Sequence, residues 1–168
     1  MALAYIGLGG NVGDVVANMA GALQLLDKSD DITVTEVSPV YRTPPWGIEE
    51  QDWFHNACAA LETTLQPSQF LDKCLETERV FKRERDVRWG PRTLDLDILL
   101  IEDMQVDEDR LTIPHPRMHE RSFVLKPLQD LAPDLNIFGK TPAIWLEALG
   151  VSEMQLVALD KDWWKSSR

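Results

Sequence analysis

Residues 88–100, RWGPRTLDLDILL, place two carboxylates, Asp95 and Asp97, directly behind a cluster of arginines. Apolar residues alternate with the aspartates, so a strand here would turn the apolar side chains to one face and both carboxylates to the other. These apolar residues are Leu94, Leu96, Ile98 and Leu100. Residues i and i+2 of a strand lie about 6.5–7 Å apart at Cα, so both carboxylates can converge on Mg²⁺, which prefers oxygen ligands. Asp-Leu-Asp alone also fits a strand with ordinary surface acids, but Trp89 and Arg92 favour a metal–phosphate site.

The composition limits the classes of partner. A chain of 168 residues with 44% hydrophobic residues suits one packed core. Its net charge of -11 argues against a general nucleic-acid or membrane binder, because both partners are anionic. Residues 79–92 nevertheless hold six basic residues against two acidic ones. This concentration fits either a solvated basic turn or a phosphate site, and in so acidic a chain we favour the second.

The cysteines and the N-terminus bear on the compartment. Cys58 and Cys74 lack the spacing of a disulfide framework or a zinc site, so we expect buried free thiols. There is no signal-peptide pattern and no run of 18 apolar residues. We therefore expect a cytoplasmic monomer that forms a single domain over residues 1–168, with the part from about 135 unassigned. Its partners would be small molecules, not nucleic acids or membranes.

The hydrophobic periodicity predicts a regular order of elements, strand, helix, strand, strand, helix, strand, helix. The strands are expected at 4–8, 32–41, 55–62 and about 94–100, and the helices at 14–27, 67–85 and from about 118. Asp14 is a candidate helix cap, and Pro127 is expected to kink or end the last helix. This order is typical of a ferredoxin-like α+β sandwich, an antiparallel sheet with helices packed on one face and the active site on the other.

The glycines near the start do not form a nucleotide-binding fingerprint. Gly7, Gly9, Gly10 and Gly13 miss the G-x-G-x-x-G spacing, because Val12 stands where the third glycine belongs. A Walker-type loop also fails here, since none of the glycines near the start precedes Lys-Ser or Lys-Thr. If a nucleotide binds, arginines and metal ions must hold its phosphates.

Several motifs together resemble one known family, the 6-hydroxymethyl-7,8-dihydropterin pyrophosphokinases of folate biosynthesis. The similar stretches are residues 88–98 (RWGPRTLDLDI), 41–45 (YRTPP), 111–116 (LTIPHP) and 121–123 (RSF). Their order along about residues 5–130 makes a chance resemblance very improbable. The family's ferredoxin-like fold agrees with the order of elements given above.

The resemblance implies transfer of a pyrophosphoryl group from MgATP to the pterin hydroxymethyl oxygen, with AMP as the leaving group. In that reaction Asp95 and Asp97 would hold two Mg²⁺ ions, and Arg83 and Arg92 would contact phosphate oxygens, so these four residues are the candidate catalytic set. Phosphoryl transfer depends mainly on alignment and charge neutralisation, which these residue types supply.

The resemblance also implies two sets of binding residues. The ATP set is Glu78, Arg83, Arg85, Trp89, Arg92, Ile98, Arg110, Thr112, His115 and Arg121. The pterin set is Thr43, Pro45, Trp46, Phe54, Asn56, Trp89, Asp95 and Phe123. Aromatic rings would sandwich the planar heterocycle while Asn56 hydrogen-bonds its edge. Without the family, simple core packing of Phe54 and Phe123 is equally reasonable.

Three positions depart from the family pattern. Lys82 stands where a glycine usually precedes the catalytic loop, Trp46 replaces a smaller aliphatic residue, and Gly10 replaces serine. The catalytic loop is also one residue shorter than in some members. Two alternatives stay open, a non-catalytic pterin- or nucleotide-binding paralogue and another two-metal nucleotidyltransferase on a similar scaffold. Intact Asp95 and Asp97 speak against the first, and the pterin motifs against the second.

Overall fold

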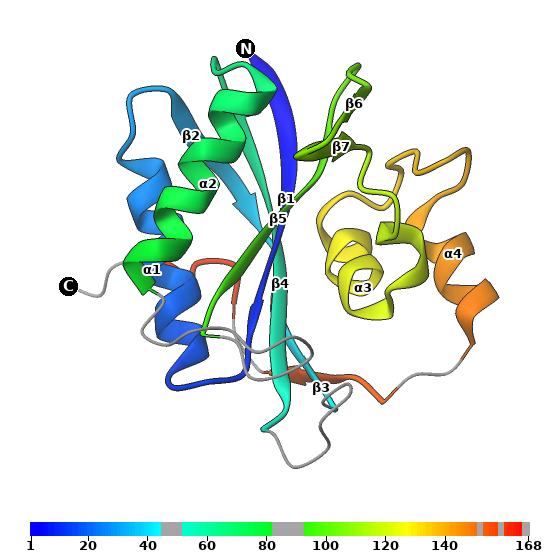
Figure 1. The fold of residues 1–168 in the computed structure, drawn as a ribbon. Helices are drawn as coiled ribbons and strands as arrows, with labels where there is room; N and C mark the ends of the chain where they lie inside the picture. Colours follow the sequence, from blue (N-terminus) through cyan, green and yellow to red (C-terminus); the bar gives the residue numbers. More distant parts are fainter. Residues whose placement is uncertain (45–51, 82–92, 151–152, 158–159, 166–168) are drawn as a thin grey trace.

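The computed structural model describes residues 1–44, 52–81, 93–150, 153–157 and 160–165. Its main sheet is antiparallel, with strand order β5-β1-β4-β3-β8 and with β2 also paired to β4 (Figure 1). The strands are β1 (Ala2–Gly10), β2 (Ile32–Val37), β3 (Val40–Thr43), β4 (Phe54–Thr63), β5 (Asp95–Ile101) and β8 (Gln155–Val157). A separate hairpin joins β6 (Val106–Glu108) to β7 (Leu111–Ile113).

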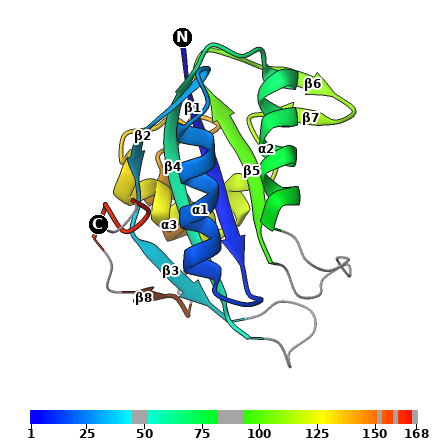
Figure 2. The same cartoon turned by 90° about the vertical axis from the view of Figure 1, so that its left-hand side faces the viewer.

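Helices cover both faces of this sheet (Figures 1 and 2). They are α1 (Val15–Asp27), α2 (Pro67–Phe81), the short 3₁₀ helix η1 (Met118–Glu120), α3 (Ser122–Leu131) and α4 (Pro142–Leu149). The two long helices α1 and α2 lie on one face, as expected from the sequence. The helices α3 and α4 lie on the other, which the sequence-based expectation had left uncovered. The expectation that all helices share one face was therefore wrong, although the α+β sandwich itself is present.

The burial of the central strands explains why two layers of helices are needed. Residues 57–61 of β4 are all buried, so both faces of that strand are covered by side chains. Ala57, Ala59 and Leu61 join the larger core cluster beneath α1 and α2. Cys58 and Ala60 join a second cluster with the buried side of α3. The site must therefore occupy the part of this second face that α3 does not cover.

Strand β5 departs from strict alternation near its end. Leu94, Leu96 and Ile98 face the larger core as predicted, but Leu100 lies in the second cluster. Tyr5 of β1 pairs with Leu100, whereas the next residue along β1 pairs with Ile98, so Leu99 is an extra residue in a bulge. The bulge comes after Asp95 and Asp97, so it leaves their predicted shared face intact.

Prolines affect two of the predicted elements. The single strand expected at 32–41 is divided into β2 and β3 at Ser38 and Pro39, where proline has no N–H to donate to a ladder. Pro127 was expected to kink or end its helix. It does not end the helix, since α3 continues past it to Leu131. Burial of Pro127 and its apolar neighbours on α3 offsets the one helical hydrogen bond that proline cannot make.

The C-terminal residues complete the edge of the sheet and part of the core. Strand β8 pairs with β3, and Trp164 is 8% exposed within the larger core cluster. The indole N–H of Trp163 donates to the Ser38 carbonyl at 2.8 Å, and Gln24 donates to the Trp164 carbonyl at 2.7 Å. The segment to which sequence reasoning gave no role is therefore a structural part of the sheet. Within the described ranges, no helix is long and apolar enough to span a bilayer.

Candidate active site

The candidate site is built on three adjacent strands, β4, β1 and β5, whose paired residues form two rows across the sheet. Gly9 of β1 pairs with Asn56 on β4 and with Asp95 on β5. Two residues earlier, Gly7 pairs with Cys58 on one side and with Asp97 on the other. Because neighbouring strands lie about 4.8 Å apart, each row spans about 10 Å between its outer Cα atoms. Both rows have a glycine at the centre, so no side chain stands between the β4 and β5 residues.

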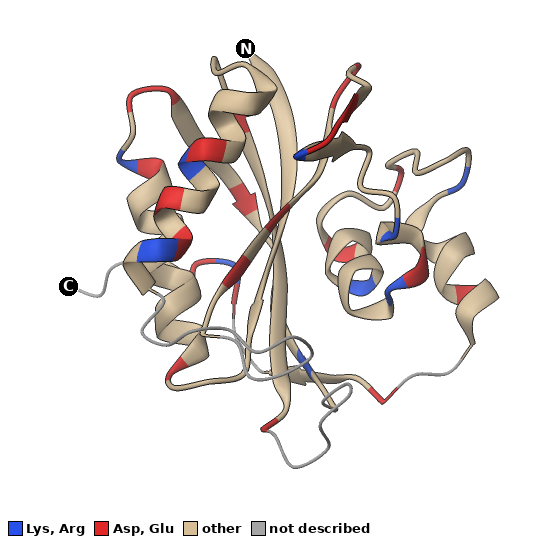
Figure 3. Cartoon of the chain, in the orientation of Figure 1, with Lys and Arg blue, Asp and Glu red and all other residues tan. Residues whose placement is uncertain are grey.

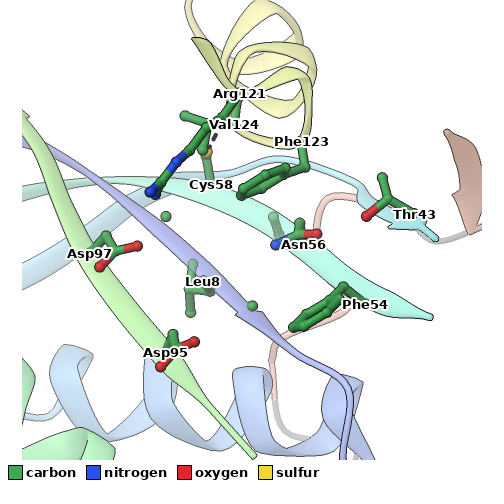
Figure 4. Close-up of a pocket in the computed structure, with 13 residues that line it drawn as sticks. Leu8, Thr43, Phe54, Asn56, Cys58, Asp95, Asp97, Arg121, Phe123 and Val124 are labelled. Carbon is green, nitrogen blue, oxygen red and sulfur yellow. Dashed lines mark hydrogen bonds between the residues drawn. The ribbon is translucent and has the colours of Figure 1, made fainter. Parts of the chain in front are cut away.

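These rows form the floor of a cavity of about 240 Å³ (Figure 4). Its walls come from β3, β4, β5 and the start of α3. It is lined by Gly7, Leu8, Gly9, Thr43, Phe54, Asn56, Ala57, Cys58, Asp95, Asp97, Arg121, Phe123 and Val124. The structure thus brings together six of the predicted residues from four separate segments of the chain, as well as Arg121 from the predicted nucleotide set.

One end of the cavity is an aromatic slot. Figure 4 shows the rings of Phe54 and Phe123 on either side of Asn56, with Thr43 beyond them. Thr43 and Asn56 are buried, at 6% and 9% exposed. The Asn56 Oδ1 atom is buried and has no hydrogen-bond partner among the described residues. An unpaired buried acceptor costs about 1–3 kcal/mol, so this atom points to a ligand that donates an N–H into the slot.

The other end of the cavity carries the two carboxylates. Asp95 and Asp97 extend from β5 on the same side as the slot, and Arg121 reaches toward them from the start of α3 (Figure 4). The Arg121 guanidinium carbon also lies 5.8 Å from the centre of the Phe123 ring, which is within the range of a cation–π contact. The cavity is therefore aromatic at one end and charged at the other.

His115 lies beside this charged end. Its backbone N–H donates to the Leu99 carbonyl at 2.7 Å, and its Nδ1 accepts from the Arg117 backbone N–H at 3.1 Å. The proton of the neutral ring is then on Nε2, which makes that atom a donor. Burial lowers the pKa of His115, and the positive charges of Arg121 and Arg117 lower it further. The negative charge of Asp97 raises the pKa but does not outweigh burial. The imidazole is accordingly neutral at pH 7.

The carboxylates suit magnesium better than a metal held by protein alone. Among the described residues, no group of three or more His, Cys, Asp or Glu side chains converges on one point. Mg²⁺ commonly binds through one or two carboxylates and fills its remaining positions with water and substrate phosphates. Asp95 and Asp97, on one side of an open strand and near Arg121 and His115, fit that coordination pattern.

Two further predicted nucleotide contacts, Glu78 and Ile98, lie at the outer edge of β5. The Glu78 side chain of α2 is 9% exposed, and its carboxylate accepts a hydrogen bond from the Leu96 N–H at 2.7 Å. Since the Leu96 N–H points away from β1, the Ile98 backbone groups point to the same edge. The Ile98 side chain is buried in the larger core, so only its backbone is available to a nucleotide. Arg110 forms an ion pair with Asp72 of α2.

Six predicted site residues lie outside the described residues. They are Pro45, Trp46, Arg83, Arg85, Trp89 and Arg92, and the departure at Lys82 lies there too. Thr112 lies in β7, in the hairpin that precedes His115. The sequence reasoning missed the contributions of Gly7, Gly9 and Cys58 to the cavity. The only signal for the glycines was their position inside a strand, which often marks a close approach of other groups.

Comparison with known proteins supplies an independent assignment. The family model described as 7,8-dihydro-6-hydroxymethylpterin-pyrophosphokinase (HPPK) matches residues 5–133. The chain belongs to this family. A relative from Methylorubrum extorquens, named 2-amino-4-hydroxy-6-hydroxymethyldihydropteridine pyrophosphokinase, is 46% identical over 157 residues, which cover 94% of this chain and 99% of the relative. A relative of the same name from Bacillus subtilis is 44% identical over 158 residues, 90% of this chain and 95% of the relative.

Solved structures of the family agree on the fold. The crystal structure of wild-type Plasmodium falciparum HPPK-DHPS with SDX-DHP superposes with a TM-score of 0.68 at 16% identity. The match covers 88% of this chain and 43% of that one, so the likeness concerns part of a longer protein. The predicted ferredoxin-like class is therefore confirmed, with α3 and α4 added on the second face.

Proposed function

We propose that this chain transfers a pyrophosphoryl group from ATP to the hydroxymethyl oxygen of 6-hydroxymethyl-7,8-dihydropterin in folate biosynthesis. The new bond joins that oxygen to the β-phosphorus, the bond between the α- and β-phosphates breaks, AMP leaves and the hydroxyl proton is released. Membership of the HPPK family and the names of relatives at 44–46% identity support the reaction. The unpaired Asn56 Oδ1 between two aromatic rings is the observation that carries the placement of the pterin.

The aromatic slot holds the pterin ring by stacking and by its polar edge. Phe54 and Phe123 supply apolar faces for a planar heterocycle, and Asn56 Oδ1 accepts from the ring N–H groups. The pyrimidine edge bears those donors, whereas the hydroxymethyl group lies at the opposite end of the pterin. With the polar edge at Asn56, the hydroxymethyl group extends across Gly9 toward Asp95 in the same row.

The charged end of the cavity receives the phosphates. Mg²⁺ held by Asp95 and Asp97, two ions by the family resemblance, would neutralise phosphate charge and favour loss of the hydroxyl proton. Asp95 lies in the row of Asn56 and so is nearer to the attacking oxygen, while Asp97 lies one row further, toward His115. The neutral His115 Nε2–H and the Arg121 guanidinium are donors for phosphate oxygens at that end.

Several finer features of the proposal rest on the resemblance. Arg83 and Arg92 would bind the transferred phosphates, and Arg85, Trp89, Pro45 and Trp46 would complete the two substrate pockets. The monomeric state and the cytoplasmic location stay predictions. ATP and the pterin are the proposed small-molecule partners.

Substrate binding tests the slot without requiring turnover. We would measure the dissociation constant of 6-hydroxymethyl-7,8-dihydropterin by titration calorimetry, with a non-hydrolysable MgATP analogue present. Loss of a buried hydrogen-bond partner predicts that Asn56→Ala weakens binding about 10- to 100-fold. The control Asn18→Ala changes an amide on α1, on the opposite face of the sheet, and should bind as the unmodified protein does. Equal affinity in the two variants would contradict the slot assignment.

A further inference from the structure

Two glycines of the central strand β1, Gly7 and Gly9, line the cavity, and they differ in how much room an added side chain would have. A Cβ atom built on Gly7 would lie 3.7 Å from the side chain of Leu99, an ordinary van der Waals contact. A Cβ atom built on Gly9 would lie 2.5 Å from Nδ2 of Asn56, closer than real Cβ contacts allow. The two positions belong to the same strand and line the same cavity. Of these two glycines, it is Gly9 whose missing side chain makes room for another residue.

The backbone around Gly9 has little freedom to relieve such a contact. Gly9 lies between β4 and β5, with Asn56 and Asp95 as its partners. The same Cβ would lie 3.4 Å from the His55 carbonyl oxygen, which belongs to the sheet backbone. A methyl group at Gly9 would therefore displace the Asn56 side chain, which can rotate, before it displaced a strand.

We propose that Gly9 is a positioning residue that sets the orientation of the Asn56 amide and thereby the affinity for the pterin. With no Cβ on Gly9, the Nδ2 group of Asn56 rests against the central strand. The other amide atom, Oδ1, is then aimed into the slot between Phe54 and Phe123, where it is buried and has no partner among the described residues. The inference rests on the proposed function, because it assigns the unpaired Oδ1 to the polar edge of the pterin.

This role predicts a selective defect. Gly9→Ala should turn the amide away from the pterin edge and leave the ATP end of the site unchanged. We expect the KM for the pterin to rise about 10- to 100-fold, the range for a lost hydrogen bond to a substrate group. The KM for ATP should change less than about twofold. Asn18→Ala, on the opposite face of the sheet, is the kinetic control and should leave both KM values near those of the unmodified protein. Gly7→Ala adds the same methyl group to the same strand without a close contact, so it is the matched control for displacement of the Asn56 side chain.

A double-mutant cycle separates displacement of Asn56 from general damage to the sheet. Once Asn56→Ala has removed the amide, adding Gly9→Ala should cost nothing further, so the double variant should match Asn56→Ala alone. A blocked path to Asp95 or a loosened strand would instead add its full effect in the double variant. Thermal midpoints of all four variants show whether each is folded, and if Gly9→Ala alone is unstable, the double variant should regain stability because the contact has gone.

The positioning role also has a readout that needs no activity. The side-chain NH₂ signals of Asn56 in an NMR spectrum of the ligand-free protein should move in Gly9→Ala and stay in place in Gly7→Ala. The inference is overturned if the Asn56 signals move equally in the two glycine variants, or if the effects of Gly9→Ala and Asn56→Ala on the KM for the pterin multiply in the double variant. A failure of the proposed function would look different, since the unmodified protein would then lack pterin-dependent AMP formation while the Asn56 signals still moved in Gly9→Ala.

Discussion

Glu78 offers a sharp test of how the candidate site is supported. Its carboxylate is buried at the outer edge of β5 and accepts the Leu96 N–H at 2.7 Å, between the two site aspartates on that strand. Glu78→Ala would leave this N–H unpaired in a buried position. A hydrogen bond to a charged group contributes about 1.5–3 kcal/mol, so we expect a loss of about 2–3 kcal/mol in the free energy of unfolding. For a domain of this size that corresponds to about 5–10 °C in Tm.

The assay is urea unfolding with thermal melting, combined with steady-state kinetics. Glu78→Gln keeps an acceptor for the Leu96 N–H and should lose less than half as much stability as Glu78→Ala. Glu76→Ala, at an exposed position on the same helix, is the control and should be within about 0.5 kcal/mol of the unmodified protein. The resemblance assigned Glu78 to nucleotide binding. If Glu78→Ala melts like the control while its KM for ATP rises tenfold, the supporting role is refuted and the nucleotide contact stands.

Two further predictions concern the C-terminal segment and the neutral histidine. Trp164→Ala removes a core side chain that is 8% exposed and should cost about 3–5 kcal/mol in urea unfolding, with turnover per folded molecule retained; a loss below 1 kcal/mol would mean that the segment is dispensable. Burial lowers the pKa of His115 below its ordinary value of about 6.5. As the pH falls, the unfolded chain therefore binds a proton at this residue before the folded protein does. The stability contributed by this group is present above pH 6.5 and is lost as the pH falls below it. Between pH 7 and pH 5, His115→Gln should therefore lose less stability than the unmodified protein, and identical pH dependence in the two proteins would contradict this reasoning.

The local pattern was sufficient to predict the elements that carry the chemistry. Alternation placed Asp95 and Asp97 on one face of a strand, and both line the cavity. Three- and four-residue spacing predicted the helix that the structure shows as α1, and Asp14 caps it by accepting from the Ala17 N–H. Cys58 and Cys74 are buried free thiols, as expected, and burial raises the pKa of Cys74 to about 12.

The features that the sequence did not predict depend on contacts between distant segments. The bulge at Leu99 arises from the register between β5 and β1, which the pattern of one strand does not encode. The second helical layer could not be predicted, because the apolar run 57–61 indicates a strand but does not show which elements cover its two faces. The role of Gly9 depends on its contact with the Asn56 amide, which strand β4 places beside it. The role of Trp164 likewise depends on its packing against a core whose other buried residues lie much earlier in the sequence.

The most direct test of the account is AMP formation from MgATP, measured with and without 6-hydroxymethyl-7,8-dihydropterin. Asp97→Asn removes a carboxylate from the charged end of the cavity, while Asp107→Asn, at an exposed position in β6, is the control. The account predicts AMP only when the pterin is present, a rate lowered about 100- to 1000-fold in Asp97→Asn, and no change in the control. The account would be contradicted by AMP formation at the same rate with and without the pterin, or by a folded Asp97→Asn variant with an undiminished rate.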